Sequence, residues 1–285
     1  MSLIQRYKNF RKIAANVKND LKVSLALRKS DCEPVIVYQM GKVGSRSIAD
    51  SLKSCGVHPV FHIHRMNLEN IKRVKDEYLK KGREPLNERL GILLYKSVCR
   101  KKRKAKFITI VREPVSRNFS AFFENFKRFT GSDFKESKLY TEELIRIFIS
   151  EYMHEVPLTW FDIEIKNTLG INVYDFQFPK EKGHMVIQKN NFELLVLKLE
   201  IPDMEKQDAI SEFINLPDFQ LIRANVGEDK DYSETYKDFK DKIQMPHSYL
   251  KRMFNSKYSR HFYSDSEIDA IWSKWSDNNK PRSNV

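Results

Sequence analysis

The sequence predicts an α/β fold: a parallel β-sheet flanked by helices, with a helical C-terminal part and a basic N-terminal helix. Short β-branched runs alternate with helical segments between Glu33 and Phe126, and helical periodicity dominates later. An alternating order of this kind builds a parallel sheet covered by helices. The chain has 285 residues, 41% of them hydrophobic and 31% charged. That length and composition can bury a sizeable core.

The first predicted element is a basic amphipathic helix over residues 1–30. These residues contain eight Lys or Arg and one acid, Asp20. Apolar residues repeat at intervals of three and four, at Leu3, Tyr7, Phe10, Ala14, Val17 and Leu21. The spacing makes one stripe along a helix. Such a stripe suits packing on the protein itself, on a second copy of the chain or on an anionic membrane surface.

Residues 31–285 are expected to form one domain with the sheet in its first part. Strands are predicted at 34–40, 57–63, 106–111 and 192–200, from their short apolar and β-branched runs. Gly56 is the stop signal of a helix over 47–55, and Pro114 suits the first turn of another that runs through Phe126. Later helices are expected at 141–153, 204–214, 246–254 and 266–275. There, Trp272 and Trp275 are expected to be core residues.

Charge and cysteine content limit the environment and the partners. A net charge of +13 favours an anionic partner such as a nucleotide, a nucleic acid, an acidic glycan or a membrane surface. Cys32, Cys55 and Cys99 have neither the pairing of a disulfide framework nor the spacing of a zinc site. No apolar run approaches the ~20 residues that cross a bilayer, and no signal peptide is evident. We therefore expect a cytoplasmic protein, with contact at the inner face of the membrane through residues 1–28 as an added possibility.

The segment GKVGSRS at 41–47 has the features of an anion-binding loop. It joins a predicted strand to a predicted helix, whose free N–H groups and dipole face the loop. Ser45, Arg46 and Ser47 add side-chain donors. In the nucleotide triphosphatase loop, GxxxxGK[ST], the lysine follows the second glycine, whereas Lys42 precedes it here. A GxGxxG dinucleotide fingerprint is also absent.

Two further groups of polar residues follow predicted strands. Arg112 ends a strand and Ser120 lies eight residues on, so that a guanidinium and a hydroxyl can hold one phosphate. His62 and His64 share one face of the second strand, because side chains alternate along a strand. A histidine near its ordinary pKa of ~6.5 is suited to accept a proton at neutral pH. The pair is also compatible with a structural or a metal-binding role.

These motifs together resemble the sulfotransferases that use 3′-phosphoadenosine 5′-phosphosulfate (PAPS). The loop is similar to those of carbohydrate-type members, and WFDIEIKNTLGINVYDFQF and NSKYSRHFYSDSEIDAIWSKW are similar to bacterial proteins described as capsular polysaccharide sulfotransferases. The resemblance implies a P-loop-like fold. It also implies a 5′-phosphosulfate site at Gly41, Lys42, Val43, Gly44, Ser45, Arg46 and Ser47, and a 3′-phosphate site at Arg112 and Ser120.

The resemblance further implies catalytic roles. Lys42 would contact the bridging oxygen of the leaving phosphate, where negative charge develops. His64, and after it His62, would be the base for the acceptor hydroxyl, since some uronosyl 2-O-sulfotransferases are similar in placing H-x-H after the second strand. Lys230, in a segment similar to the family's late loop, would add a 3′-phosphate contact. Glu200 matches a common acidic position near the active site.

The expected function is transfer of a sulfuryl group from PAPS to a hydroxyl of a carbohydrate, such as a capsular or exopolysaccharide acceptor, in polysaccharide biosynthesis. No metal and no nucleic-acid partner are expected. Two other hypotheses remain open at this stage: an ATP-dependent kinase with a divergent phosphate loop, and a basic module that binds a polyanion. The acceptor hydroxyl and the oligomeric state are not specified by the sequence.

Overall fold

The computed structural model describes residues 3–29, 33–82, 84–134, 137, 139–222 and 233–276. Five strands form one mostly parallel sheet flanked by helices, so the predicted α/β class is confirmed. The strands are β1 (Val35–Tyr38), β2 (Val60–Ile63), β3 (Ala105–Val111), β4 (His184–Lys189) and β5 (Phe192–Lys198).

The strands lie in the order β2-β1-β3-β5-β4. The first four of these are parallel neighbours, and β4 pairs antiparallel with β5. The predicted parallel sheet is therefore present except at this edge, where β4 runs antiparallel. Residues 184–189 read HMVIQK, and only Ile187 among them is buried. The half-exposed pattern is typical of an edge strand, which sequence analysis did not identify.

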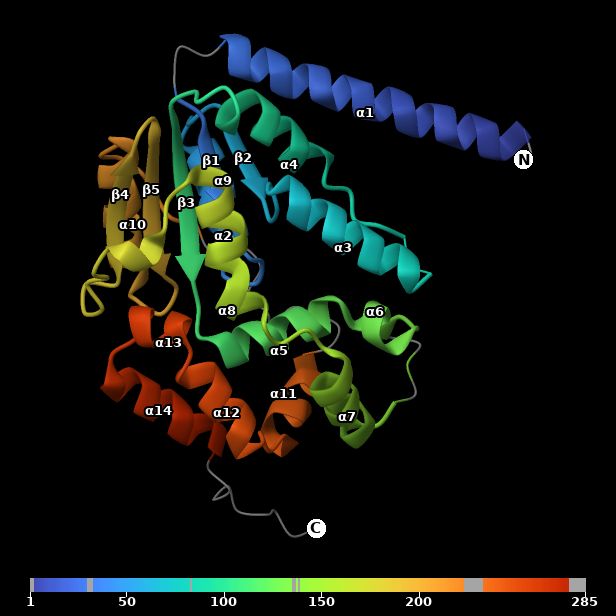
Figure 1. Ribbon diagram of the computed structural model, residues 1–285, viewed down its shortest axis with the longest axis vertical. Helices are drawn as coiled ribbons and strands as arrows, with labels where there is room; N and C mark the ends of the chain where they lie inside the picture. Colours follow the sequence, from blue (N-terminus) through green and yellow to red (C-terminus); the bar gives the residue numbers. More distant parts are fainter. Residues whose placement is uncertain are drawn as a thin grey trace.

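Helices lie on both sides of the sheet and at its carboxyl edge (Figure 1). Figure 1 shows β3 pointing towards α5 and the C-terminal helices, so the loops that follow β1, β2, β3 and β5 share this edge. The helices in the first half are α1 (Leu3–Lys29), α2 (Ser45–Ser54), α3 (Leu68–Lys80), α4 (Arg89–Leu94), η1 (Tyr95–Cys99), α5 (Pro114–Glu124) and α6 (Phe126–Thr130).

The second half of the chain is mainly helical, as predicted. Its elements besides β4 and β5 are α7 (Thr141–Glu151), α8 (Val156–Trp160), η3 (Phe161–Lys166), α9 (Asn167–Leu169), η4 (Val173–Asp175), α10 (Asp203–Ile214), α11 (Ser233–Lys242), α12 (His247–Phe254), α13 (Lys257–Phe262) and α14 (Asp265–Ser276). Helices α3 and α4 were not predicted, and the helix predicted at 114–126 covers α5 but only the first residue of α6. It also began α2 at Ser47, two residues late, because Ser45 and Arg46 already lie in the first turn.

Aromatic packing holds the C-terminal helices against α5. The ring of Phe119 lies 4.7 Å from that of Phe148 on α7, 5.2 Å from Phe239 on α11 and 4.9 Å from Trp275 on α14. All four side chains are buried. Aromatic pairs at these distances are each stabilising beyond the apolar area that they bury. The predicted core position of Trp275 is confirmed, while Trp272 is half-buried beside Phe254.

The predicted basic N-terminal helix is α1, and it extends away from the sheet (Figure 1). Its C-terminal end is held by Leu27, which is buried, and by an ion pair between Asp20 and Arg89. Within the residues described, no helix is both long and apolar enough to span a membrane.

Candidate active site

The loop between β1 and α2 forms a tight turn at the carboxyl edge of the sheet. Gly41, Lys42 and Gly44 have positive φ angles of 81°, 63° and 75°. Gly44 precedes α2 and provides no side-chain cap. The first N–H groups of the helix therefore face the loop without an intrahelical acceptor, which is the arrangement that binds anions.

A buried arginine on α5 fixes this loop from behind. Arg117 donates from Nη2 to the carbonyl oxygen of Met40 at 2.7 Å and from Nε to that of Gly41 at 3.3 Å. Its third nitrogen donates to the hydroxyl of Tyr152 at 2.9 Å. Since these two carbonyl groups accept hydrogen bonds from Arg117, the guanidinium fixes the backbone of the loop directly before Lys42. Sequence analysis did not identify Arg117, although it lies in the same VREPVSRNFS segment as Arg112.

The structure brings Arg112 and Ser120 next to the loop, as their spacing predicted. Nη1 of Arg112 donates to the hydroxyl of Ser120 at 3.0 Å and to the carbonyl oxygen of Lys42 at 2.8 Å. The hydroxyl of Tyr258 on α13 bonds to both backbone groups of Arg112, at 3.0 Å to its nitrogen and 2.8 Å to its oxygen. Tyr258 is fully buried, so it holds the backbone of Arg112 beside the loop.

Lys42 lies in the loop, but its side chain has a partner that sequence analysis did not foresee. Nζ of Lys42 forms an ion pair with Glu124 at the end of α5, at 3.0 Å. The two side chains are 26% and 47% exposed. An exposed ion pair of this kind contributes little to stability, about 0–1 kcal/mol. The ammonium group can therefore exchange this carboxylate for another anion at small cost.

His62 and His64 lie side by side at the end of β2, with ring centroids 5.0 Å apart, which confirms their predicted common face. Gln39, which sequence analysis missed, joins them to the loop. Its side-chain nitrogen donates to the Ser45 hydroxyl at 2.7 Å, and that hydroxyl lies 2.8 Å from Nε2 of His62. Because the Ser45 oxygen already accepts from Gln39, its own hydrogen is available to His62.

Gln39 also faces His64. Nδ1 of His64 lies 2.9 Å from the side-chain nitrogen of Gln39 and 3.1 Å from the backbone carbonyl oxygen of Gln39. The side-chain nitrogen can donate to an unprotonated Nδ1, and the carbonyl oxygen can accept from a protonated Nδ1. Either neutral tautomer of the ring therefore has a partner. The ring also lies against the loop, since a Cβ added at Gly41 would be 3.9 Å from it.

Both histidines favour the neutral form. Burial, together with the neighbouring His64, Arg46 and Lys53, lowers the pKa of His62 to about 4. The protein atoms packed around His64 likewise lower its pKa from the ordinary value, although part of the residue is exposed. Removing water from around an imidazole disfavours its charged form. At neutral pH the two rings are therefore able to accept protons.

The remaining predicted residues differ in their surroundings. Val43 is buried, Arg46 is exposed and Ser47 is half-buried at the start of α2. Lys230 lies outside the described residues. Glu200 follows β5, where its carboxylate accepts from the backbone nitrogen of Glu113 at 2.8 Å and from the hydroxyl of Tyr263 at 3.1 Å. The surrounding protein raises the pKa of Glu200. Among the residues described, no group of three or more His, Cys, Asp or Glu is positioned to hold a metal ion.

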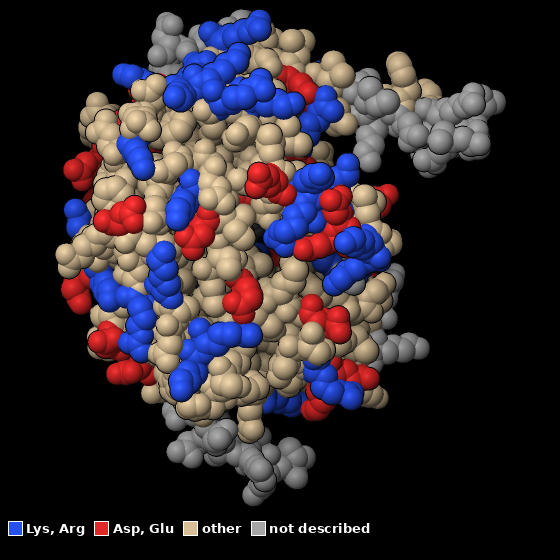
Figure 2. Space-filling model, viewed as in Figure 1, with Lys and Arg blue, Asp and Glu red and all other residues tan. Residues whose placement is uncertain are grey.

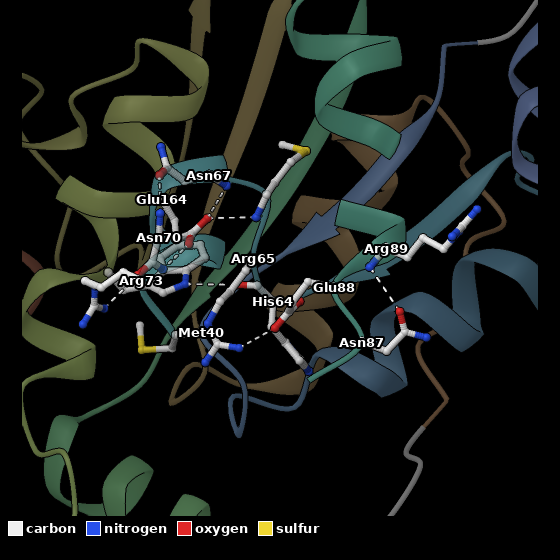
Figure 3. A network of polar contacts seen from close by, with 12 residues as sticks. Met40, His64, Arg65, Asn67, Asn70, Arg73, Asn87, Glu88, Arg89 and Glu164 are labelled. Atoms are coloured by element: carbon white, nitrogen blue, oxygen red, sulfur yellow. Dashed lines mark hydrogen bonds and ion pairs between the residues drawn. The ribbon is translucent and has the colours of Figure 1, made fainter. Parts of the chain in front are cut away.

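A buried carboxylate near the ends of β1 and β2 ties the site to the second half of the chain (Figure 3). Glu164, in the π-helical turn η3, accepts from the backbone nitrogens of Met66 and Asn67 at 2.9 and 3.0 Å. It also accepts from the side chains of Tyr38 and Asn70. These donors lie at the end of β1 and in the segment that follows His64, so Glu164 fixes the ends of two strands. No sequence signal distinguished it from the other acids of the chain.

Replacing Glu164 by glutamine is expected to lower the free energy of unfolding by about 1–3 kcal/mol, because an N–H₂ group would face buried donors. Leucine should cost more, about 3–5 kcal/mol, since all four donors lose their partner. Urea denaturation measures both. Asp162→Asn, at an exposed position two residues away, is the matched control and should stay within about 0.5 kcal/mol of the parent. A Glu164→Leu protein as stable as the parent would contradict this structural role.

A hollow elsewhere on the surface contains none of the predicted site residues. Its lining comes from the segment before β4 and from α13: Gln177, Phe178, Pro179, Lys180, Arg260 and His261. Nε2 of His261 is buried there without a hydrogen-bond partner among the described residues, and burial lowers its pKa to about 4. Since β4 and β2 are opposite edges of the sheet, this hollow is separate from the histidine pair.

Comparison with known proteins gives one finding for the second half of the chain. No significant match to a curated protein or to a solved structure is found. A family model, NKWYS, described as "Putative capsular polysaccharide synthesis protein", matches residues 135–264. The matched part includes Glu164 and Tyr258, which contact the strand ends and Arg112, but not the loop at 41–47. Over residues 135–264, the chain is thus similar to a family whose description is capsular polysaccharide synthesis.

Proposed function

We propose that the protein transfers a sulfuryl group from PAPS to a hydroxyl of a carbohydrate acceptor. The observation that carries this proposal is the hydrogen bond between Arg112 and the carbonyl oxygen of Lys42, at 2.8 Å. It joins two features that can each hold a phosphate: the turn before α2 and the Arg112–Ser120 pair. A ligand with phosphates at two ends of one nucleoside fits such a pair better than a single phosphate does.

The residues of the site fit the two charged ends of PAPS. The uncapped start of α2 and the side chains of Arg46 and Ser47 would hold the 5′-phosphosulfate, and Arg112 with Ser120 would hold the 3′-phosphate. The similarity to a family described as capsular polysaccharide synthesis supports a carbohydrate acceptor, because it is the one direct link to a substrate class.

The chemistry requires a base and a group that stabilises the leaving oxygen. The acceptor oxygen bonds to sulfur while the bond from sulfur to the 5′-phosphate oxygen breaks, and that oxygen keeps the electron pair. His64, an exposed residue, would accept the hydroxyl proton at a ring nitrogen. Lys42 would leave Glu124 and place its ammonium group at the leaving oxygen, where charge develops. Ser45 and His62, bonded to each other, would support the loop and the orientation of the neighbouring ring.

The test of the donor site is a thermal-shift titration without metal, with 3′,5′-adenosine bisphosphate beside 5′-AMP and ATP. At a hundred times its dissociation constant, a ligand stabilises the native state by about 2.7 kcal/mol, which shifts the melting temperature by several degrees. We expect the bisphosphate to give the largest shift. Arg112→Ala should remove most of the difference between the bisphosphate and 5′-AMP, since it deletes the guanidinium from the second phosphate site.

Two further variants distinguish a loss of nucleotide binding from a loss of folding. Ser120→Ala removes only a hydroxyl whose described partner is Arg112, and it should lower the preference for the bisphosphate without changing the melting temperature of the free protein. Arg100→Ala, at an exposed arginine outside the site, should leave the shift unchanged. Equal shifts with ATP, or a requirement for Mg²⁺, would contradict the proposal and favour a kinase. Binding that depends on salt but not on the nucleotide would favour a polyanion-binding module.

A further inference from the structure

Helix α1 carries an apolar stripe that none of the described residues of the chain covers. Tyr7, Phe10, Val17, Leu21 and Leu25 are between 42% and 68% exposed. With about 100° of rotation per residue, these five positions fall within an arc of about 80°. Their common orientation makes one continuous exposed surface along the helix, which we call the α1 stripe.

The side of α1 that contacts the rest of the protein is a different one. Leu27 is buried, Val23 and Ala26 pack against the core, and Asp20 forms an ion pair with Arg89. On the same helical rotation, Leu27 and Asp20 lie about 110° from the centre of the α1 stripe. The stripe is therefore not the surface by which α1 docks on its own protein.

Basic residues flank the α1 stripe along one side, where Arg11, Lys18 and Lys22 are exposed, and Arg28 is exposed at its C-terminal end. The single acid of the helix, Asp20, is engaged by Arg89, whose hydrogen bond lowers the pKa of that carboxyl. The loop at 100–104, RKKRK, adds five more basic residues. Figure 2 shows Lys and Arg gathered at this end of the molecule. Arg103 donates to the carbonyl oxygen of Leu27, so the loop and the end of α1 form one basic surface.

We propose that α1 lies on an anionic membrane surface, with the α1 stripe among the lipid chains and the flanking lysines and arginines at the phosphate groups. An exposed apolar stripe flanked by basic residues is the pattern of an interfacial helix. Lipid phosphates complement the charge of the surface. A second copy of α1 on the same stripe would instead bring two sets of basic residues together, and like charges repel.

The position of α1 is compatible with an active site that remains open. The loop at 100–104 precedes β3, and α1 leads into β1, so both lie at the amino edge of the sheet. The loop at 41–47, His64 and Arg112 lie at the carboxyl edge. Membrane contact through α1 therefore leaves the site free to accept a soluble nucleotide, and the inference does not depend on the proposed reaction.

The test is co-sedimentation of the full chain with vesicles of equal parts phosphatidylcholine and phosphatidylglycerol, beside vesicles of phosphatidylcholine alone. We expect binding to the anionic vesicles that weakens as salt is raised. Phe10→Asp combined with Leu21→Asp should reduce the partition coefficient at least ~10-fold, because two charges enter the apolar stripe. Leu79→Asp on α3 is the matched control, since Leu79 is 54% exposed and lies outside α1; it should bind as the parent does.

Two results would overturn the proposal. The first is a parent protein that ignores anionic vesicles, or a Phe10→Asp/Leu21→Asp variant that binds them as well as the parent. The second is a parent that sediments as a dimer and a variant that sediments as a monomer, with no vesicle binding by either. That result would identify a second copy of the chain as the occupant of the α1 stripe. Melting temperatures of the variants, measured alongside, should equal that of the parent because the substituted side chains are exposed.

Discussion

Lys42→Ala is expected to lower the rate constant of sulfuryl transfer about 10²- to 10³-fold, the usual effect of removing one group that stabilises developing negative charge. The lysine lies in a turn whose backbone is fixed by Arg117 and by Arg112, so its Cα is well placed, while the partly exposed ion pair of its side chain with Glu124 contributes little to stability. The loss should appear in kcat rather than in KM, because the charge at the leaving oxygen develops only as the bond breaks. Steady-state kinetics with a saturating donor measures it.

Glu124→Gln is the matched control for Lys42→Ala. Both substitutions abolish the ion pair between these side chains, but only one removes the ammonium group. We expect Glu124→Gln to retain the parent rate, and both variants to melt within a few degrees of the parent, as an exposed ion pair stabilises little. A Lys42→Ala protein that is folded and fully active would contradict the assigned role. Equal losses in the two variants would instead show that the ion pair itself matters.

Local patterns were sufficient to predict the elements that carry the site. A strand, a glycine-containing turn and a helix start are encoded by neighbouring residues in one continuous segment, and the structure has them at 35–54. The alternation of strand side chains likewise placed His62 and His64 on one face. The eight-residue interval from Arg112 to Ser120 works for a related reason, since two turns of α5 return the hydroxyl to the strand end.

The contacts that fix these residues could not be predicted, because they join distant parts of the chain. Tyr258 lies 146 residues from Arg112, and Glu164 lies 126 residues from Tyr38. Nothing in the sequence around a tyrosine or a glutamate specifies such a partner. The ion pair of Lys42 with Glu124 likewise joins residues that are far apart in the sequence. The antiparallel direction of the edge strand β4 depends on the turn at 190–191, which reverses the chain between β4 and β5.

His64→Ala is expected to lower kcat/KM for the acceptor about 10²- to 10⁴-fold, the range for a general base. Both histidines are neutral at pH 7, but their surroundings differ. Nε2 of His62 is engaged by Ser45 within the protein, whereas His64 is an exposed residue whose ring lies beside Gly41. An acceptor hydroxyl can therefore reach His64 more directly. His62→Ala should cost less, since it removes a partner of Ser45 and not the base.

The pH dependence distinguishes a base from a structural residue. The neutral ring is the active form, and a lowered pKa keeps it neutral into more acidic solution. The acidic limb of the activity profile should thus have its midpoint below the ordinary histidine pKa of about 6.5. Because the two rings interact, the midpoint of the acidic limb belongs to the pair of histidines and not to either ring alone. Of the two, His62 has a pKa of about 4 and is protonated only in strongly acidic solution. His62→Ala removes a neighbour that can become charged, so it should leave the acidic limb in place.

His64→Ala should lose that acidic limb together with most of the rate. If His64 instead only positions the loop against Gly41, its removal would lower the rate while the remaining activity kept the acidic limb of the parent. The same profile recorded for Lys42→Ala is the internal comparison, because that variant lowers the rate and retains both histidines. An acidic limb that persists in His64→Ala but disappears in His62→Ala would identify His62 as the base. In that case the hydrogen bond between His62 and Ser45 would have to break during each turnover.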